Sequence, residues 1–115
     1  MKLKKSKIEA CQVKTILDAL FKVNGTTLEQ LVGHKRKYVF DRMIFSDYCN
    51  EKYTFEAIAE FMNMKSHASI LSHLKQIQND LKCTIEFKEM YLKVYQYIEN
   101  EETGNEVELE IVETV

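Results

Sequence analysis

The chain has 115 residues, of which 45% are hydrophobic and 30% are charged. This length fits one domain with a real core and leaves no room for a separate catalytic domain, so we expect one function-bearing module. The absence of proline and the presence of only three glycines favour helices and argue against a many-turned β-sandwich.

The cysteines and the start of the chain indicate in which cellular compartment we expect the protein. The three cysteines are Cys11, Cys49 and Cys83. They lie far apart without paired spacing, which indicates neither a zinc site nor a disulfide framework. We expect them to be reduced and half-buried in a cytoplasmic protein. The basic start MKLKKSK is followed by a segment interrupted by Glu9, Lys14 and Asp18, which excludes a signal peptide or membrane span there.

The net charge of −2 hides an uneven distribution along the chain. All 16 lysines and arginines and 11 of the 18 acidic residues lie in residues 1–98, which carry +5, whereas seven glutamates give residues 99–115 a charge of −7. We therefore expect a mildly basic helical domain over residues 1–98 and an acidic tail over residues 99–115. Such a basic body is compatible with phosphate binding.

The first predicted helix covers residues 8–23 and ends at Asn24 and Gly25, which tolerate the left-handed backbone that stops helices. Thr26 or Thr27 then caps a short helix that Gly33 closes. Its expected buried face consists of Leu28, Leu31 and Val32.

The densest positive run follows, His34-Lys35-Arg36-Lys37, and leads into a long predicted helix over residues 38–51 with Arg42 on its basic side. Positive charge at a helix N-terminus opposes the helix dipole and costs some tenths of a kcal/mol per charge. An anionic partner would explain why the charge is there.

Residues 54–81 predict two helices joined by a short turn. Thr54 is a suitable N-cap for a helix that ends near Met62, and Ser66 is suitable for a second helix over residues 66–82. An apolar stripe faces the core from the second helix: Ile70, Leu74, Ile77 and Leu81. The opposite face is polar and begins with short side chains, which suit contact with base edges and phosphates.

A last amphipathic helix is predicted over residues 84–98, with Tyr91, Tyr95 and Tyr97 at the core or its rim rather than on a base-stacking platform. In the tail, Val107, Leu109 and Ile111 alternate with glutamates, a pattern typical of a short strand. A single strand leaves its backbone groups unpaired, so we expect a flexible tail or one ordered by a protein partner.

The basic run, the long helix and the helix pair together resemble the C-terminal DNA-binding domain of the bacterial replication initiator DnaA, which has a Trp-repressor-like helical fold. The similarity extends over residues 13–98 and is most specific over residues 55–77. The positions that fall in register there are Ile58, Phe61, Lys65, His67, Ser69, Ile70, Leu71 and Ile77. The resemblance implies an all-α helical bundle that contains a helix-turn-helix.

The resemblance also implies a set of DNA-binding residues. Lys65 matches a turn arginine that touches phosphate, His67 matches a histidine that reads the major groove, and Ser69 keeps a hydroxyl at a threonine position. Lys35, Arg36 and Lys37 match a basic loop on the minor groove and backbone. Arg42 matches an arginine early in the long helix, and Thr54 occupies the place of a backbone contact.

Three positions depart from the family pattern, because Ser66 replaces an aspartate, Ala68 a threonine and Ser72 a histidine, while His73 lies one position later. Serine accepts from a cytosine amino group less selectively than aspartate does, and Ala68 can still meet a thymine methyl. Each lost base contact costs about 1–3 kcal/mol. We expect these four residues to take part in DNA binding with a different or looser sequence preference.

The leading hypothesis is a stand-alone module that binds double-stranded DNA, without a cofactor, metal or small-molecule substrate. No Gly-rich phosphate loop of an ATPase is present in the sequence. The alternative is a protein-interaction or regulatory module that kept the fold and lost sequence-specific reading, with the acidic tail as a partner site or a cover for the basic face. An enzyme is the weakest reading, since His67 and His73 lie on different helix faces without a matching carboxylate or nucleophile.

Overall fold

The computed structural model describes residues 4–103. Six α-helices and two short 3-10 helices make up this part of the chain, and the only extended pairing within it is one isolated bridge between Lys5 and Tyr53. The elements are η1 (Ala10–Val13), α1 (Lys14–Asn24), α2 (Leu28–Leu31), η2 (Arg36–Tyr38), α3 (Val39–Cys49), α4 (Phe55–Phe61), α5 (Ala68–Cys83) and α6 (Ile85–Thr103). The prediction of an all-α fold is confirmed for these residues.

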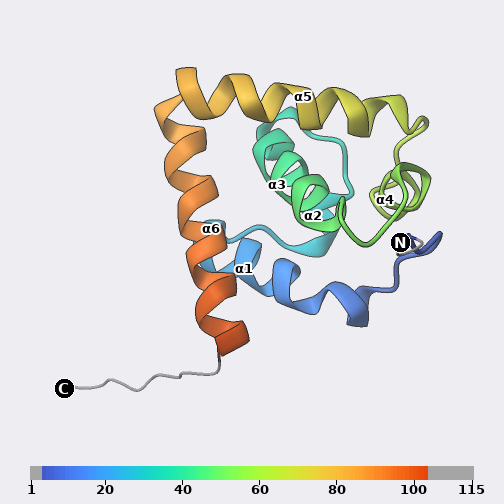
Figure 1. Ribbon diagram of the computed structural model, residues 1–115, viewed down its shortest axis with the longest axis horizontal. Helices are drawn as coiled ribbons and strands as arrows, with labels where there is room; N and C mark the ends of the chain where they lie inside the picture. Colours follow the sequence, from blue (N-terminus) through green and yellow to red (C-terminus); the bar gives the residue numbers. More distant parts are fainter. Residues whose placement is uncertain (1–3, 104–115) are drawn as a thin grey trace.

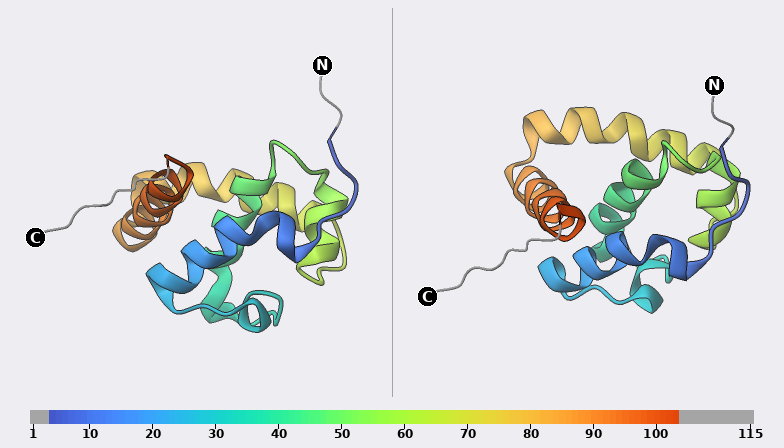
Figure 2. Two further views of the ribbon diagram at one scale, coloured as in Figure 1. Left: turned by 90° about the horizontal axis from the view of Figure 1, so that it is seen from below. Right: turned by 60° about the horizontal axis from the view of Figure 1, so that its bottom comes forward.

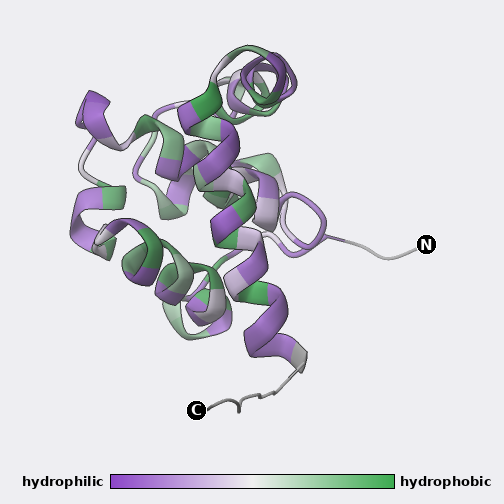
Figure 3. Ribbon diagram, turned by 90° about the vertical axis from the view of Figure 1, so that its left-hand side faces the viewer, coloured by the Kyte–Doolittle hydropathy of each residue, from purple (hydrophilic) through white to green (hydrophobic). Residues whose placement is uncertain are grey.

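Helix α3 lies in the middle of the molecule, with α5 across the top of Figure 1, α6 on the left, α1 below and α4 on the right. It packs against α5 and α1, and six of its successive residues, 41–46, are buried. Phe45 is fully buried and stacks on Phe61 of α4 with ring centroids 5.3 Å apart. The core is therefore built around α3, and the surrounding helices alternate between hydrophobic and hydrophilic stretches (Figure 3).

The first predicted helix is shorter than expected and is preceded by a 3-10 turn. Glu9 and Gln12 form a reciprocal capping box around η1, while Ile8 and Val13 are buried. The helix ends as predicted, because Gly25 takes a left-handed conformation with φ 73° and donates from its N–H to the Phe21 carbonyl at 2.7 Å.

The short helix α2 confirms Thr27 as a cap, since its side chain accepts from the Gln30 N–H at 3.2 Å. Its predicted buried face is only partly right. Leu31 is fully buried, but Leu28 in the first turn is 41% exposed. A helix of a single turn covers one inward position fully, and here that position is Leu31.

Helix α6 continues past the predicted end at Ile98 as far as Thr103, so residues 99–103 of the expected tail are helical. The hydroxyls of Tyr91 and Tyr95 donate to Oδ2 of Asp47 on α3 at 3.0 and 2.6 Å, which confirms that these tyrosines pack at the core rim. The strand predicted near residues 107–111 lies outside the described residues.

Two further expectations concern the cysteines and the membrane. Cys49 is buried, whereas Cys11 and Cys83 are exposed, so none matches the expected half-buried state. Both exposed cysteines lie near helix ends, where one side of the helix faces solvent. Within residues 4–103, no helix has the length and apolar character needed to cross a bilayer.

Candidate nucleic-acid interface

Thr54 begins α4 as predicted, because its Oγ1 accepts from the Ala57 N–H at 3.1 Å. The side chain is half-buried and is used by this cap. Ala57 and Ile58 then fix the inner face of α4 in the core. A phosphate contact by Thr54 would therefore have to share the capping hydroxyl.

The connection from α4 to α5 reverses the chain within residues 62–67. Met62 is fully buried, and Asn63 adopts a left-handed backbone with φ 60°. The Met64 N–H donates back to the Ala59 carbonyl at 2.8 Å, which closes the end of α4. The turn is thus held by backbone bonds and leaves Lys65, Ser66 and His67 exposed.

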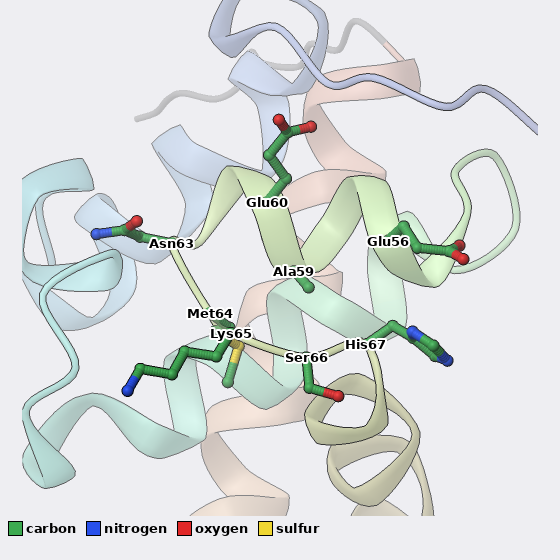
Figure 4. A pocket seen from close by; sticks show the side chains of 8 residues that line it. All are labelled: Glu56, Ala59, Glu60, Asn63, Met64, Lys65, Ser66 and His67. Atoms are coloured by element: carbon green, nitrogen blue, oxygen red, sulfur yellow. The ribbon is translucent and has the colours of Figure 1, made fainter.

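Figure 4 shows Lys65 and His67 pointing to different sides of this turn, with Ser66 between them. The adjoining open groove, about 480 Å³ in volume, is also lined by Glu56 and Glu60 of α4. Two carboxylates beside one ammonium make the groove unfavourable for a phosphate. Cationic contacts with a polyanion must therefore come mainly from residues around it.

Helix α5 begins two residues later than predicted, at Ala68, with His67 in the N-cap position. Ser66 still serves the helix start, since its Oγ accepts from the Ala68 N–H at 3.1 Å. The first turn leaves Ala68 and Ser72 exposed and Ser69 half-buried. The polar front face expected from the sequence is present.

The predicted apolar stripe of α5 faces the core. Ile70 and Ile77 are buried, and Leu74 and Leu81 are half-buried against the same core. Leu71 lies outside this stripe and is 42% exposed. The outer face of α5 is therefore polar with one apolar side chain in it.

The basic loop, residues 34–37, leads into η2. His34 has a positive φ of 67°, and the side chains of Lys35, Arg36 and Lys37 are all exposed. The Lys37 ammonium lies 5.5 Å from the centre of the Tyr38 ring, and none of the three cations forms an ion pair with a described carboxylate. Their charges are available to an external anion.

Arg42 was expected to contact DNA from the surface of the long helix, but its side chain is only 5% exposed. Its Nη2 donates to the Lys35 carbonyl at 2.8 Å, so it clamps the basic loop from inside. Nη1 is buried and donates to no described residue. Burial lowers the pKa of Arg42, which the neighbouring Asp41 charge partly offsets.

The carboxylate of Asp41 is itself held on the other side of α3. Its Oδ1 accepts from Asn24 and Thr26, each at 2.9 Å, and burial raises the pKa of Asp41 above its ordinary value despite these bonds. These bonds tie the end of α1 to α3. Asp41 therefore does not neutralise the basic loop.

His73, expected as a groove contact, has a partly covered side chain. It is half-buried on α5, and its Nδ1 is buried without a described hydrogen-bond partner. Burial lowers the pKa of His73, and the nearby Arg42 charge lowers that pKa further. Arg42 thus holds the loop through the carbonyl at position 35 and is close enough to His73 of α5 for its charge to act on that histidine.

The sequence-predicted residues fall into three groups. The exposed group comprises the loop cations and the turn and front of α5: Lys35, Arg36, Lys37, Lys65, Ser66, His67, Ala68 and Ser72. Ser69, Thr54 and His73 are half-buried. Arg42 is buried, because it lies on α3, which packs against α1 and α5.

Comparison of the chain with protein-family models, with curated proteins and with solved structures gives no match. The likeness to the initiator domain therefore depends on the residues and spacings quoted above.

Proposed function

We propose that the protein is a stand-alone module that binds double-stranded DNA, with α4 and α5 acting as a helix-turn-helix. The front of α5 enters the major groove, and the basic loop contacts the neighbouring backbone or minor groove. The observation that carries the proposal is the Arg42 clamp, which holds the Lys35 carbonyl while lying beside His73 of α5. The basic loop is thereby held by α3, which packs directly against α5.

Size and chemistry support this assignment. The front of α5 presents a histidine, small residues and hydroxyls, which can approach base edges closely, and Leu71 is the one large apolar side chain exposed beside them. The loop supplies three positive charges that form no ion pair with a described carboxylate. Phosphate contacts position such a protein, and base contacts then select the sequence.

The proposal is tested by selecting tight-binding duplexes from a random pool and measuring affinity by fluorescence anisotropy at several salt concentrations. Replacing Arg36 and Lys37 with alanine should weaken binding to all duplexes and reduce the salt slope by up to about 1.8, because each phosphate contact contributes about 0.9. The matched control replaces Lys88 and Lys93, two exposed lysines of α6. Equal behaviour of the two double variants would exclude the loop as a DNA contact.

Base reading is tested at the helix front. His67→Ala should cost about 1–3 kcal/mol on the preferred duplex and much less on a scrambled one. If both duplexes lose affinity equally, His67 contacts the backbone and does not read sequence.

The exposed Leu71 and the acidic groove beside α4 favour a second candidate, a protein-interaction module that uses the same helix pair. An apolar contact is less sensitive to salt than phosphate binding. A wild-type protein that shows no salt-dependent binding to any duplex, but binds a protein through Leu71, would support this candidate. A Leu71→Ser variant provides the comparison.

A further inference from the structure

The N-terminal segment, residues 4–7, is an arm fixed to the entrance of α4. The Lys5 N–H donates to the Lys52 carbonyl at 2.8 Å, and the Thr54 N–H donates to the Lys5 carbonyl at 2.9 Å. Ile8, at the end of the arm, is buried in the core. The arm therefore has a defined position beside the first residue of the proposed helix-turn-helix.

Four lysines surround this entrance: Lys4, Lys5, Lys7 and Lys52. All four are exposed, and none forms an ion pair with a described carboxylate. Lys4 lies over the Phe55 ring, with its ammonium 5.7 Å from the ring centre. Lys4, Lys5 and Lys7 follow one another along the arm, and the backbone of Lys5 pairs with that of Lys52, so one anionic partner could meet several of these charges.

The arm and the basic loop lie on different sides of the helix pair. In both views of Figure 2, the arm is the blue segment beside α4, whereas the cyan-to-teal segment that contains the loop lies on the other edge of the molecule. The start of α5 and α4 lie at the same end of the molecule as the arm in Figure 1. An extended polyanion along the front of α5 would thus have cations near both of its flanks.

We propose that the arm lysines and Lys52 form a second contact with the DNA backbone, beyond α4, so that the protein grips the duplex from two sides. This inference rests on the proposed DNA-binding function and extends its footprint to residues outside the helix pair and the loop. The fixed backbone of the arm limits the entropy lost when its lysines meet phosphates.

The experiment compares two triple variants with the same change in net charge. The arm variant carries Lys4→Gln, Lys5→Gln and Lys7→Gln, and the control variant carries Lys22→Gln, Lys88→Gln and Lys93→Gln on exposed sites of α1 and α6. The bridge to Tyr53 uses backbone atoms of residue 5, so glutamine leaves its hydrogen bonds in place. Far-ultraviolet circular dichroism and thermal unfolding check that both variants fold.

The arm variant should bind the selected duplex more weakly than wild type, with a salt slope reduced by up to about 2.7, at about 0.9 per lost phosphate contact. The control variant should keep a slope close to that of wild type. A second measurement uses the unaltered protein: amine acetylation followed by mass spectrometry should show DNA protecting Lys4, Lys5, Lys7 and Lys52 but not Lys88 or Lys93.

The outcomes separate the two claims. If wild-type protein binds no duplex, the proposed function fails. If it binds and loop variants weaken it, but the arm variant matches the control and the arm lysines stay reactive, only the second contact is excluded. Both variants are also compared with wild type for binding to anionic lipid vesicles. If the arm variant binds DNA as wild type does but loses vesicle binding, the arm contacts a membrane surface and the inference is overturned.

Discussion

Replacing Arg42 with methionine tests whether Arg42 holds the basic loop in place or contacts DNA itself. Methionine is also long and unbranched, but it carries no charge and donates no hydrogen bond. The change removes the 2.8 Å bond to the Lys35 carbonyl, and a hydrogen bond to a charged group contributes about 1.5–3 kcal/mol. It also removes Nη1, a buried donor without a described partner, and such a donor costs about 1–3 kcal/mol. These effects oppose each other, so the free energy of unfolding should lie between about 1.5 kcal/mol above and about 2 kcal/mol below that of wild type.

DNA binding should weaken even if the stability of the variant equals that of wild type. Without the clamp, residues 35–37 must be ordered when DNA binds, and fixing the backbone costs about 1–2 kcal/mol per residue. Even one such residue lowers affinity about tenfold, since about 1.4 kcal/mol corresponds to a factor of ten. Because Arg42 itself is buried, the salt slope should stay that of wild type.

The assay combines urea unfolding, followed by circular dichroism, with anisotropy titrations of the selected duplex. Arg36→Met is the matched control, because it removes an exposed guanidinium and should reduce the salt slope by about 0.9. Affinity of Arg42→Met within twofold of wild type would refute the clamp. A slope reduced as much as in the control would show that Arg42 reaches a phosphate.

Three further predictions concern the rest of the fold. Burial and Arg42 lower the pKa of His73 in the folded protein, so the neutral imidazole contributes to stability above about pH 6.5, the pKa of an unfolded histidine. This contribution is lost as the pH falls toward the folded pKa. In Arg42→Met, NMR titration should show the pKa of His73 shifted upward. Tyr95→Phe, which loses the 2.6 Å bond to Asp47, should lower the free energy of unfolding by about 1.5–3 kcal/mol, whereas Tyr48→Phe, whose hydroxyl is 3.5 Å from a carboxylate, should change it by under about 0.5 kcal/mol. Gly25→Ala should cost about 1 kcal/mol in urea unfolding through backbone strain alone, because a Cβ there meets no atom within 4 Å; a neutral change would exclude that strain.

Local signals predicted the helices well. Thr54, Thr27 and Gly25 act as the expected caps and stop because these residues interact with backbone a few positions away. The inner face of α5 follows from the spacing of Ile70 and Ile77, which an α-helix places on one side.

Long-range packing explains what the sequence did not reveal. Arg42 looked like a surface cation, but α3 is surrounded by other helices, so its neighbours in space decide its role. His73 turns inward for the same reason. The arm contact proposed above was not predicted from the sequence, although its lysines are visible there, because the position of the arm depends on pairing with residues about 48 positions away.

The extension of α6 to Thr103 gives the molecule an electrical polarity. Glu99, Glu101 and Glu102 are exposed in the last residues of α6. This end of the helix points down in Figure 1, whereas α5 lies across the top. In the field of a polyanion, such a dipole experiences a torque that turns the acidic end away before contact. Collisions would then arrive with α5 facing forward more often than random tumbling allows, and added salt would erase this orienting effect.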